Sequence, residues 1–487
     1  MAGGWASLVQ DTATQLTGDS AGEHRPLKEA TRRVSLGQER TLSHARLRAT
    51  RMRMIGAGSR TVSPTGRTLR VSGATLLLGL LLSLLPFEAG AQANPTAEVP
   101  AEPGSELRVW LLTAEPGEAV WERFGHNAIR VLDTRTGRDA AYNWGIFDFN
   151  QVDFIPRFLK GEMLYQMAPF ATGPMIESYA RAQREVVLQE LALTPAQRLA
   201  LSDYAEWNAL PENRAYFYDY FRDNCSTRVR DVLDQVLGGA LFNRFGEAPT
   251  GTSYRYHIRG LTRSDPLLYT GMDVLLGSTG DQDISVWEEM FLPMTLRDAV
   301  RTVTVLDENG EERPLVMSEE IVSPGSGTTE AAVPPSWLPG YLLLGLMLGG
   351  MLAWTGILAS RGSRAAVYFV GMIGTAWSLL VGLVGTIMVL ALFTDHEFMA
   401  WNQTLFVVNP LSLALAVLIP ITLIRGKAHR ATSTAALAVV CAAALGVLVQ
   451  VVPTFQQQNL IFLAWMVPTH IGLWFALSRL ESASVPE

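Results

Sequence analysis

The sequence is poor in cysteine, with only Cys225 and Cys441 among its 487 residues. Cys441 lies in an apolar stretch typical of a membrane span, so Cys225 has no disulfide partner in its own part of the chain. Residues 94–336 also lack a Cys/His cluster with the spacing of metal ligands. The sequence therefore predicts neither a disulfide-stapled domain nor a metal site.

Nucleotide-binding motifs are missing as well. The chain has neither a P-loop nor a dinucleotide fingerprint, and no cofactor is expected. Charged residues make up only 17% of the chain and hydrophobic residues 48%, which is apolar for a soluble protein. The net charge is -7, although the first 70 residues are rich in arginine. Because an apolar run follows them, they indicate a targeting segment, and no nucleic-acid partner is expected.

The N-terminal apolar run, Ala74–Phe87, is too short to cross a bilayer comfortably. It follows Arg67 and Arg70 and precedes an A-x-A site that ends at Ala93, so residues 71–93 are predicted to be a signal peptide or an uncleaved anchor. We expect residues 1–70 to be a disordered leader or to precede the true start of translation. Residues 94–106 are expected to form a linker.

The C-terminal third contains long apolar stretches separated by short loops. They predict five transmembrane helices within residues 337–480, at 337–359, 367–394, 404–424, 433–453 and 459–478. Lys and Arg occur in the first and third loops and are absent from the second and fourth. By the positive-inside rule, residues 94–336 are then external and the C-terminus is cytoplasmic. The predicted signal peptide independently requires the same side for residues 94–336.

The spans carry no Asp, Glu, Lys or Arg at mid-depth, which argues against a transporter. The second loop is the most polar external feature of this module, and it is expected to be a lipid- or domain-binding segment or a solvated connector. Its candidate residues, near the outer membrane surface, are His396, Asn402 and Asn409.

Residues 107–304 indicate an exported α+β domain with an antiparallel sheet. Apolar, β-branched and aromatic runs predict strands at 107–113, 126–132, 141–149 and 185–193, with 216–221 extended. Val152–Leu159 is expected to be a short helix, and a capping box at Thr194–Gln197 predicts the start of another. Residues 305–336, rich in Glu, Ser, Gly, Thr and Pro, are expected to be a tether.

Cys225 stands where a further helix should begin, because Asp223 and Asn224 are good N-caps and an apolar helical pattern follows. A helix N-terminus stabilises a thiolate and offers N–H groups to an oxyanion. His126, at the start of a strand, is the candidate base, and Asn143 on the next strand would orient its ring. The alternatives are that Cys225 is a packing residue and that His257 is the base.

Several motifs carry a family resemblance. Residues 121–127 (WERFGHN), 142–149 (YNWGIFDF) and 223–228 (DNCSTR) resemble the exported domain of the Lnb-type bacterial lipoprotein N-acyltransferases. Residues 254–255, 276–277 and 287–293 (WEEMFLP) are similar to later blocks, and 394–396 with Asn402 and Asn409 to a loop of full-length members. The resemblance covers about 107–300 well and the membrane part more loosely. The His-then-Cys order is similar to that of permuted papain-like folds of the NlpC/P60 and LRAT type.

The resemblance implies acyl transfer from a phospholipid to Cys225 and then to the N-terminal amine of a lipoprotein, with no cofactor. It implies that Cys225 is the catalytic nucleophile and His126 its base, and Asn143 is the candidate third catalytic residue. The residues that it suggests for substrate or lipid binding are Asn127, Asn224, Ser226, Arg255, His396, Asn402 and Asn409. Two alternatives stay open: a membrane-tethered cysteine peptidase or cell-wall amidase with water as acceptor, and a non-enzymatic sensor or scaffold.

Overall fold

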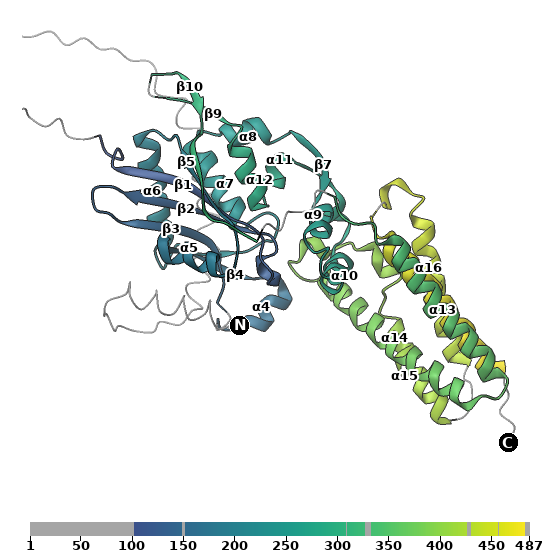
Figure 1. Cartoon of the computed structure of the whole chain (residues 1–487). Helices are drawn as coiled ribbons and strands as arrows, with labels where there is room; N and C mark the ends of the chain where they lie inside the picture. Colours follow the sequence, from purple (N-terminus) through teal and green to yellow (C-terminus); the bar gives the residue numbers. More distant parts are fainter. Residues whose placement is uncertain are drawn as a thin grey trace, which may run out of the picture. The chain divides into compact units, whose positions relative to one another are not determined.

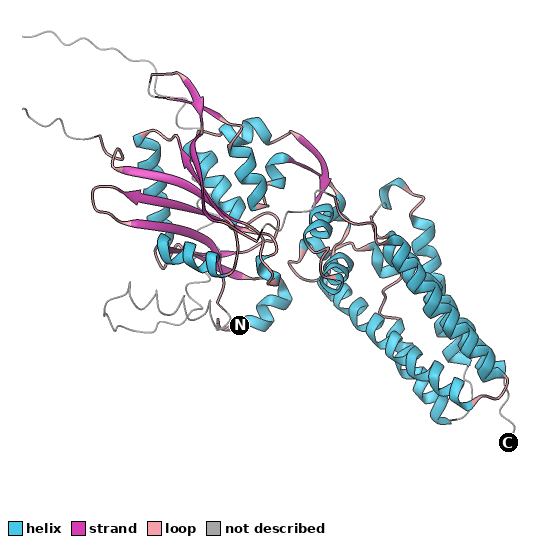
Figure 2. Cartoon of the chain, in the orientation of Figure 1, coloured by secondary structure: helices cyan, strands magenta, loops and turns pink. Residues whose placement is uncertain are grey.

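The computed structural model describes residues 102–148, 151–307, 309–326, 333–425, 430–455 and 457–482. The expected leader and signal peptide, and residues 94–101 of the expected linker, lie outside the described residues. Within these ranges the strands all lie between residues 107 and 323, and only helices and turns follow Leu338 (Figure 2).

Seven strands form one sheet in the order β11-β5-β1-β2-β3-β4-β6, and every neighbouring pair is antiparallel (Figure 1). The strands are β1 (Leu107–Ala114), β2 (His126–Asp133), β3 (Asp139–Ile146), β4 (Leu164–Ala171), β5 (Val186–Leu191), β6 (Ala215–Phe217) and β11 (Val316–Ser323). Two small pairs are added: β7 (Pro249–Ser253) with β8 (Asp283–Ser285), and β9 (Thr304–Leu306) with β10 (Glu312–Pro314). The α+β class with an antiparallel sheet is confirmed.

Helices cover both faces of this sheet. The helices of this part are α4 (Phe154–Lys160), α5 (Thr172–Arg181), α6 (Pro195–Ala209), α7 (Cys225–Val236), α8 (Ala240–Phe245), α9 (Tyr254–Leu261), α10 (Pro266–Leu275), α11 (Val286–Glu289) and α12 (Pro293–Val300), with the short 3-10 helices η2 (Val120–Glu122) and η3 (Ser278–Asp281). Alternate side chains of β1 pack into two different hydrophobic cores, one on each face of the sheet. Leu111 packs in a cluster with Val229 of α7, and Leu112 in a cluster with Met175 of α5.

Local capping sets where the two predicted helices begin. Thr194 and Gln197 form the expected capping box at the start of α6. At the start of α7, the Asn224 side chain accepts hydrogen bonds from the N–H groups of Ser226 and Thr227, and the Thr227 hydroxyl accepts one from Asn224 N–H. This reciprocal cap makes Cys225 the first residue of its helix.

The expectation that residues 305–336 are only a tether is wrong for the first half of that segment. Residues 312–314 belong to the β9–β10 pair, and β11 forms an edge strand paired with β5. Because an edge strand pairs on one side and β11 leaves most of its side chains exposed, it tolerates a polar composition that resembles a linker. The aromatic run 216–221 is also mostly not a strand, since β6 ends at Phe217 and a turn bridges Asp219 to Asp223.

In the described part of the membrane module, four helices are long and apolar enough to cross a bilayer. They are α13 (Leu338–Ser360), α14 (Arg364–Ala391), α16 (Arg430–Val449) and α17 (Leu460–Ser482). The remaining expected span, 404–424, starts later than predicted, because Asn402 caps the 3-10 helix η5 (Gln403–Phe406) before α15 (Ser412–Arg425) begins. The 14 residues of α15 rise about 21 Å, less than the ~30 Å of a hydrocarbon core. Two more 3-10 helices are η4 (Glu397–Met399) and η6 (Pro453–Phe455).

Small residues let α13 and α17 pack backbone to backbone. A Cβ on Gly349 would lie 2.2 Å from the Pro468 carbonyl oxygen, and one on Gly472 would lie 2.1 Å from the Gly349 carbonyl oxygen. Such close approach through glycine is how membrane helices associate without a hydrophobic driving force. The pair α13–α17 therefore forms the tightest contact of the module.

Candidate active site

The thiol of Cys225 lies where α7 packs against β2 and β3. Gly145, near the end of β3, has φ +88°, and the β3–β4 register shifts between Asn143 and Ile146. A Cβ on Gly145 would lie 3.5 Å from the Cys225 Cβ and 3.8 Å from the Tyr218 ring. The left-handed backbone requires glycine here, and the absence of a side chain keeps the space beside the thiol open.

The imidazole of His126, at the first position of β2, is held by Asn143 on β3. The His126 Nε2 and the Asn143 Oδ1 are 2.9 Å apart. The Asn143 amide nitrogen donates to the Ala141 carbonyl, so the amide oxygen must face the ring. Nε2 therefore carries the proton and donates a hydrogen bond to Asn143 Oδ1, which leaves Nδ1 as the basic nitrogen for the thiol.

The electrostatic surroundings favour a thiolate at Cys225. Burial by itself raises the pKa of this thiol. The charge of the facing His126, its side-chain hydrogen bond, and the backbone N–H groups of Asn127 and Ser226 outweigh burial, so the pKa lies below the ordinary value for cysteine. The arrangement can activate a sulfur nucleophile.

Three of the expected substrate-binding side chains have another role. Asn127 and Ser226 are fully buried, and the single proton of the Ser226 hydroxyl lies within hydrogen-bond distance of two acceptors, Asn127 Oδ1 and the Met290 carbonyl oxygen. Asn224 is buried too, and its amide donates to the Phe291 carbonyl. These side chains face the interior, where they fasten the start of α7 to β2 and to the segment around Met290.

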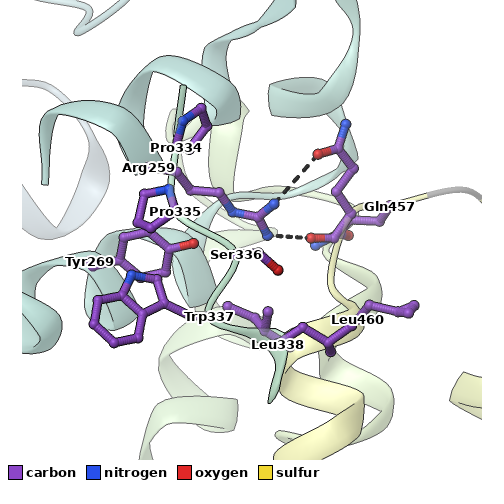
Figure 3. Close-up of a pocket in the computed structure, with 11 residues that line it drawn as sticks. Arg259, Tyr269, Pro334, Pro335, Ser336, Trp337, Leu338, Gln457 and Leu460 are labelled. Atoms are coloured by element: carbon purple, nitrogen blue, oxygen red, sulfur yellow. Dashed lines mark hydrogen bonds between the residues drawn. The ribbon is translucent and has the colours of Figure 1, made fainter. Parts of the chain in front are cut away.

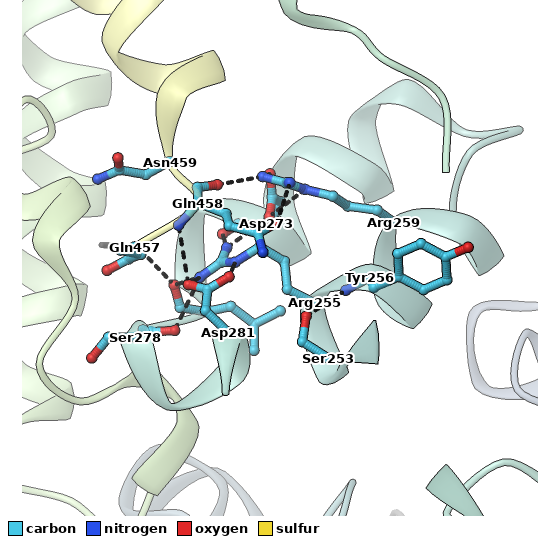
Figure 4. Close-up of polar contacts among 12 residues, drawn as sticks. Ser253, Arg255, Tyr256, Arg259, Asp273, Ser278, Asp281, Gln457, Gln458 and Asn459 are labelled. Atoms are coloured by element: carbon cyan, nitrogen blue, oxygen red, sulfur yellow. Dashed lines mark hydrogen bonds and ion pairs between the residues drawn. The ribbon is translucent and has the colours of Figure 1, made fainter. Parts of the chain in front are cut away.

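Arg255 is likewise not exposed to a substrate. Its side chain is fully buried between Asp273 and Asp281, and it also donates to the carbonyl groups of Leu276 and Gly277 (Figure 4). Arg259 pairs with the other oxygen of Asp273 and donates to the Gln458 carbonyl. The cluster connects α9 and α10 of the exported domain with the loop before α17.

Comparison with known proteins identifies the family of this chain. The family model of the Lnb N-terminal periplasmic domain matches residues 101–260, and that of the Lnb transmembrane domain matches residues 346–480. The chain belongs to the Lnb family. The resemblance predicted from the motifs is thereby confirmed, and this Lnb-family chain is an inner-membrane protein with a periplasmic domain. No curated protein and no solved structure matched.

The loop after α14 contacts the periplasmic domain of this Lnb-family chain. His396 Nε2 lies 2.9 Å from the carbonyl oxygen of Phe158 in α4. Asn402 is buried, donates to the Val274 carbonyl and accepts from Gln457, so it does not face lipid. Asn409 is also buried and packs against Gly385 of α14. Of the three loop residues, His396 alone stays partly accessible.

A pocket of about 400 Å³ opens beside this junction (Figure 3). Arg259, Tyr269 and Trp337 line it together with Gln457 and Leu460. None of its lining residues belongs to the Cys225 site.

His257, the alternative base, is bound to Glu289 and Thr252, whereas His126 is the imidazole that contacts the thiol.

The aromatic side chains beside Cys225 were not predicted from the sequence. Tyr218 lies close to Gly145 beside Cys225, and its ring stacks on Tyr165 of β4 with centroids 4.0 Å apart. The run 216–221 was predicted only as an extended segment, and its alternation of aromatic residues was the available signal. The strand that supplies Tyr165 was not predicted.

Asn143→Ala is expected to lower turnover by about 10- to 100-fold while leaving the fold intact, because it frees the His126 ring and lets the wrong tautomer form. Asn143→Gln, which keeps an amide, should recover part of the loss if the amide oxygen can still reach Nε2. The measurement is the initial rate of the enzymatic reaction of each purified variant in lipid. An unchanged rate for Asn143→Ala would show that Asn143 does not orient the base.

Proposed function

We propose that this chain is a membrane-bound thiol acyltransferase that moves an acyl chain from a phospholipid to the N-terminal amino group of a lipoprotein. The observation that carries the proposal is the set formed by Cys225, His126 and Asn143, with the thiol at the start of α7 and its pKa lowered. Membership of the Lnb family supports the substrates.

In the first half-reaction, Nδ1 of His126 takes the thiol proton, and the sulfur of Cys225 attacks the carbonyl carbon of a phospholipid ester. Backbone N–H groups at the start of α7 would stabilise the oxyanion. The ester C–O bond then breaks, and the His126 imidazolium gives its proton to the departing alkoxide. The products are a lysophospholipid and an acyl-Cys225 thioester.

In the second half-reaction, the free amine at the N-terminus of a lipoprotein attacks the thioester carbonyl carbon. An amide C–N bond forms, the C–S bond breaks, and His126 takes the proton lost by the nitrogen and returns it to the sulfur. The sum is one ester consumed and one amide formed, with no oxidant, reductant or cofactor. Water in place of the amine would make the chain a hydrolase.

The proposed topology keeps the site next to both lipid substrates. The loop between α13 and α14 carries Arg361 and Arg364, and this loop and the C-terminus would face the cytoplasm. The loop after α14, which contacts α4 through His396, would then face the periplasm on the same side as Cys225.

The decisive experiment is the intact mass of a diacylated lipoprotein co-expressed with this chain. Acyl transfer predicts a gain of one acyl chain at the N-terminal amine. An unchanged lipoprotein together with cleaved wall peptides would instead support the amidase alternative.

The alkylation of Cys225 should depend on pH in a way that reveals its partner. Since His126 holds the pKa of the thiol below its ordinary value, iodoacetamide should react at a lower pH than with a free cysteine. In His126→Ala the charge and the hydrogen bond of the ring are lost, and only the backbone N–H groups of Asn127 and Ser226 still oppose burial, so the midpoint should move to higher pH. The check is the alkylation rate of Cys225 against pH in both proteins, followed by mass; coincident profiles would contradict the pairing.

A further inference from the structure

Helix α4 is built unlike a helix of a soluble domain. None of its seven residues is buried. Ile155 and Leu159 are more than 60% exposed, and their spacing of four residues puts them on one face of the helix. Val152, just before the helix, is also more than 60% exposed. A single short helix is marginal in water, and a contiguous exposed apolar face marks a contact with another apolar body.

The contacts of α4 indicate that its exposed apolar face contacts the lipid bilayer. Its last residue, Lys160, accepts a hydrogen bond at its carbonyl from Asp395 N–H, and the Phe158 carbonyl meets His396. Asp395 follows the end of the apolar helix α14, at Ala391, by only four residues. The end of α4 is therefore fixed close to the point where α14 leaves the membrane.

The neighbouring side chains have the character of a membrane interface. In the loop after α14, Phe393 is 83% exposed and Trp401 is 79% exposed. Exposed aromatic residues at the end of a span are typical of the headgroup level. The last turn of α4 carries Arg157 and Lys160, which suit the phosphate groups of lipids.

A continuous run of aromatic rings leads from α4 to the nucleophile. Phe154 of α4 contacts Phe147 with ring centroids 5.3 Å apart, Phe147 contacts Tyr165 at 4.9 Å, and Tyr165 stacks on Tyr218 at 4.0 Å. Tyr218 lies beside Gly145, which faces Cys225. An acyl chain that moves along these rings would stay in contact with apolar surface from the bilayer to the thiol.

We propose that α4 is an interfacial helix whose face formed by Ile155 and Leu159 lies in the outer leaflet together with Val152 just before it, and that the aromatic run guides lipid acyl chains from it to Cys225. The contact between α4 and lipid stands on the exposed side chains of α4 and on its bonds to the loop after α14, and it does not depend on the proposed function. The guiding of acyl chains rests on the proposed function.

The lipid contact can be tested without any activity. The full chain with Cys225→Ser and Cys441→Ala has no other cysteine, so a fluorescent label can be attached at Ile155→Cys or at the control Ile321→Cys. Ile321 is comparably exposed, at 57%, on the edge strand β11. In phosphatidylcholine–phosphatidylglycerol vesicles with nitroxide-labelled acyl chains, we expect strong quenching at position 155 and little at 321. Equal quenching at the two positions would overturn the proposal.

The acyl route is tested by transfer rates. Ile155→Glu with Leu159→Glu should lower acyl transfer by about 10-fold or more, because charge opposes insertion of the helix, whereas Ile321→Glu should not. Alkylation of Cys225 by iodoacetamide should stay within about twofold of normal in all variants, which shows an intact site. Unchanged transfer would remove α4 from the acyl route. If the unaltered chain transfers no acyl group, the proposed function fails, and the quenching experiment still decides the lipid contact.

Discussion

Cys225→Ala is expected to abolish acylation of a co-expressed lipoprotein, because no other atom in the site can form the thioester. His126→Ala is expected to lower the rate by about 100- to 10,000-fold, the usual contribution of a general base. The thiolate of the variant would also form at higher pH, since the charge of the ring and its hydrogen bond are lost. The measurement is the fraction of lipoprotein that gains one acyl mass per unit time.

The matched control is Cys441→Ala, which removes the other free thiol of the described chain and should leave the rate unchanged. All variants need to be present in the membrane at equal amounts. Full activity in His126→Ala would refute the Cys225–His126 pair. Full activity in Cys225→Ala would refute the thioester and favour the scaffold alternative.

Asp273→Ala is expected to destabilise the periplasmic domain by about 3–5 kcal/mol, which is the usual result of removing one partner from a buried ion pair. Asp273 is fully buried and pairs with Arg255, also fully buried, and with Arg259. Without Asp273, Arg255 would share its charge only with Asp281. The thermal unfolding midpoint of the purified chain in detergent should fall by several degrees as a result.

A surface pair provides the comparison for this variant. Arg301 pairs with Glu319 while both side chains are about one-third exposed, and Arg301→Ala should cost about 0–1 kcal/mol. If Asp273→Ala and Arg301→Ala shift the midpoint equally, the buried cluster is not what joins α9 to α10. Because the cluster also reaches Gln458, a large loss should also increase proteolysis between the domain and α17.

Much of the site could be predicted because it depends on local patterns. The cap of α7 is a contact between Asn224 and residues two and three positions later, so a short motif is enough to put Cys225 first in its helix. A turn between β2 and β3 likewise makes Asn143 a neighbour of His126, since a hairpin pairs residues close in sequence.

The roles of other motif residues could not be predicted from proximity. Asn127 and Ser226 are 99 positions apart, and Ser226 meets Met290 from a third segment. In a sequence, polar residues beside a reactive cysteine resemble ligand-binding residues. In the folded domain Asn127 and Ser226 are buried, and their hydrogen bonds fasten the start of α7. The polar edge strand β11 could not be predicted from the sequence either, because a strand that is mostly exposed shows no apolar pattern.

The sequence by itself determined the apolar membrane stretches, the Lnb family and the antiparallel α+β class, and it indicated Cys225 and His126 as the candidate pair, because hydropathy, capping and hairpins are local properties. Only the tertiary structure decided that Arg255 lies inside an ion-pair cluster and that α15 is short. It alone showed that α4 is held against the loop after α14 with its apolar face exposed. The physical reason is that burial and charge pairing depend on which distant segments meet, and no local pattern encodes that choice.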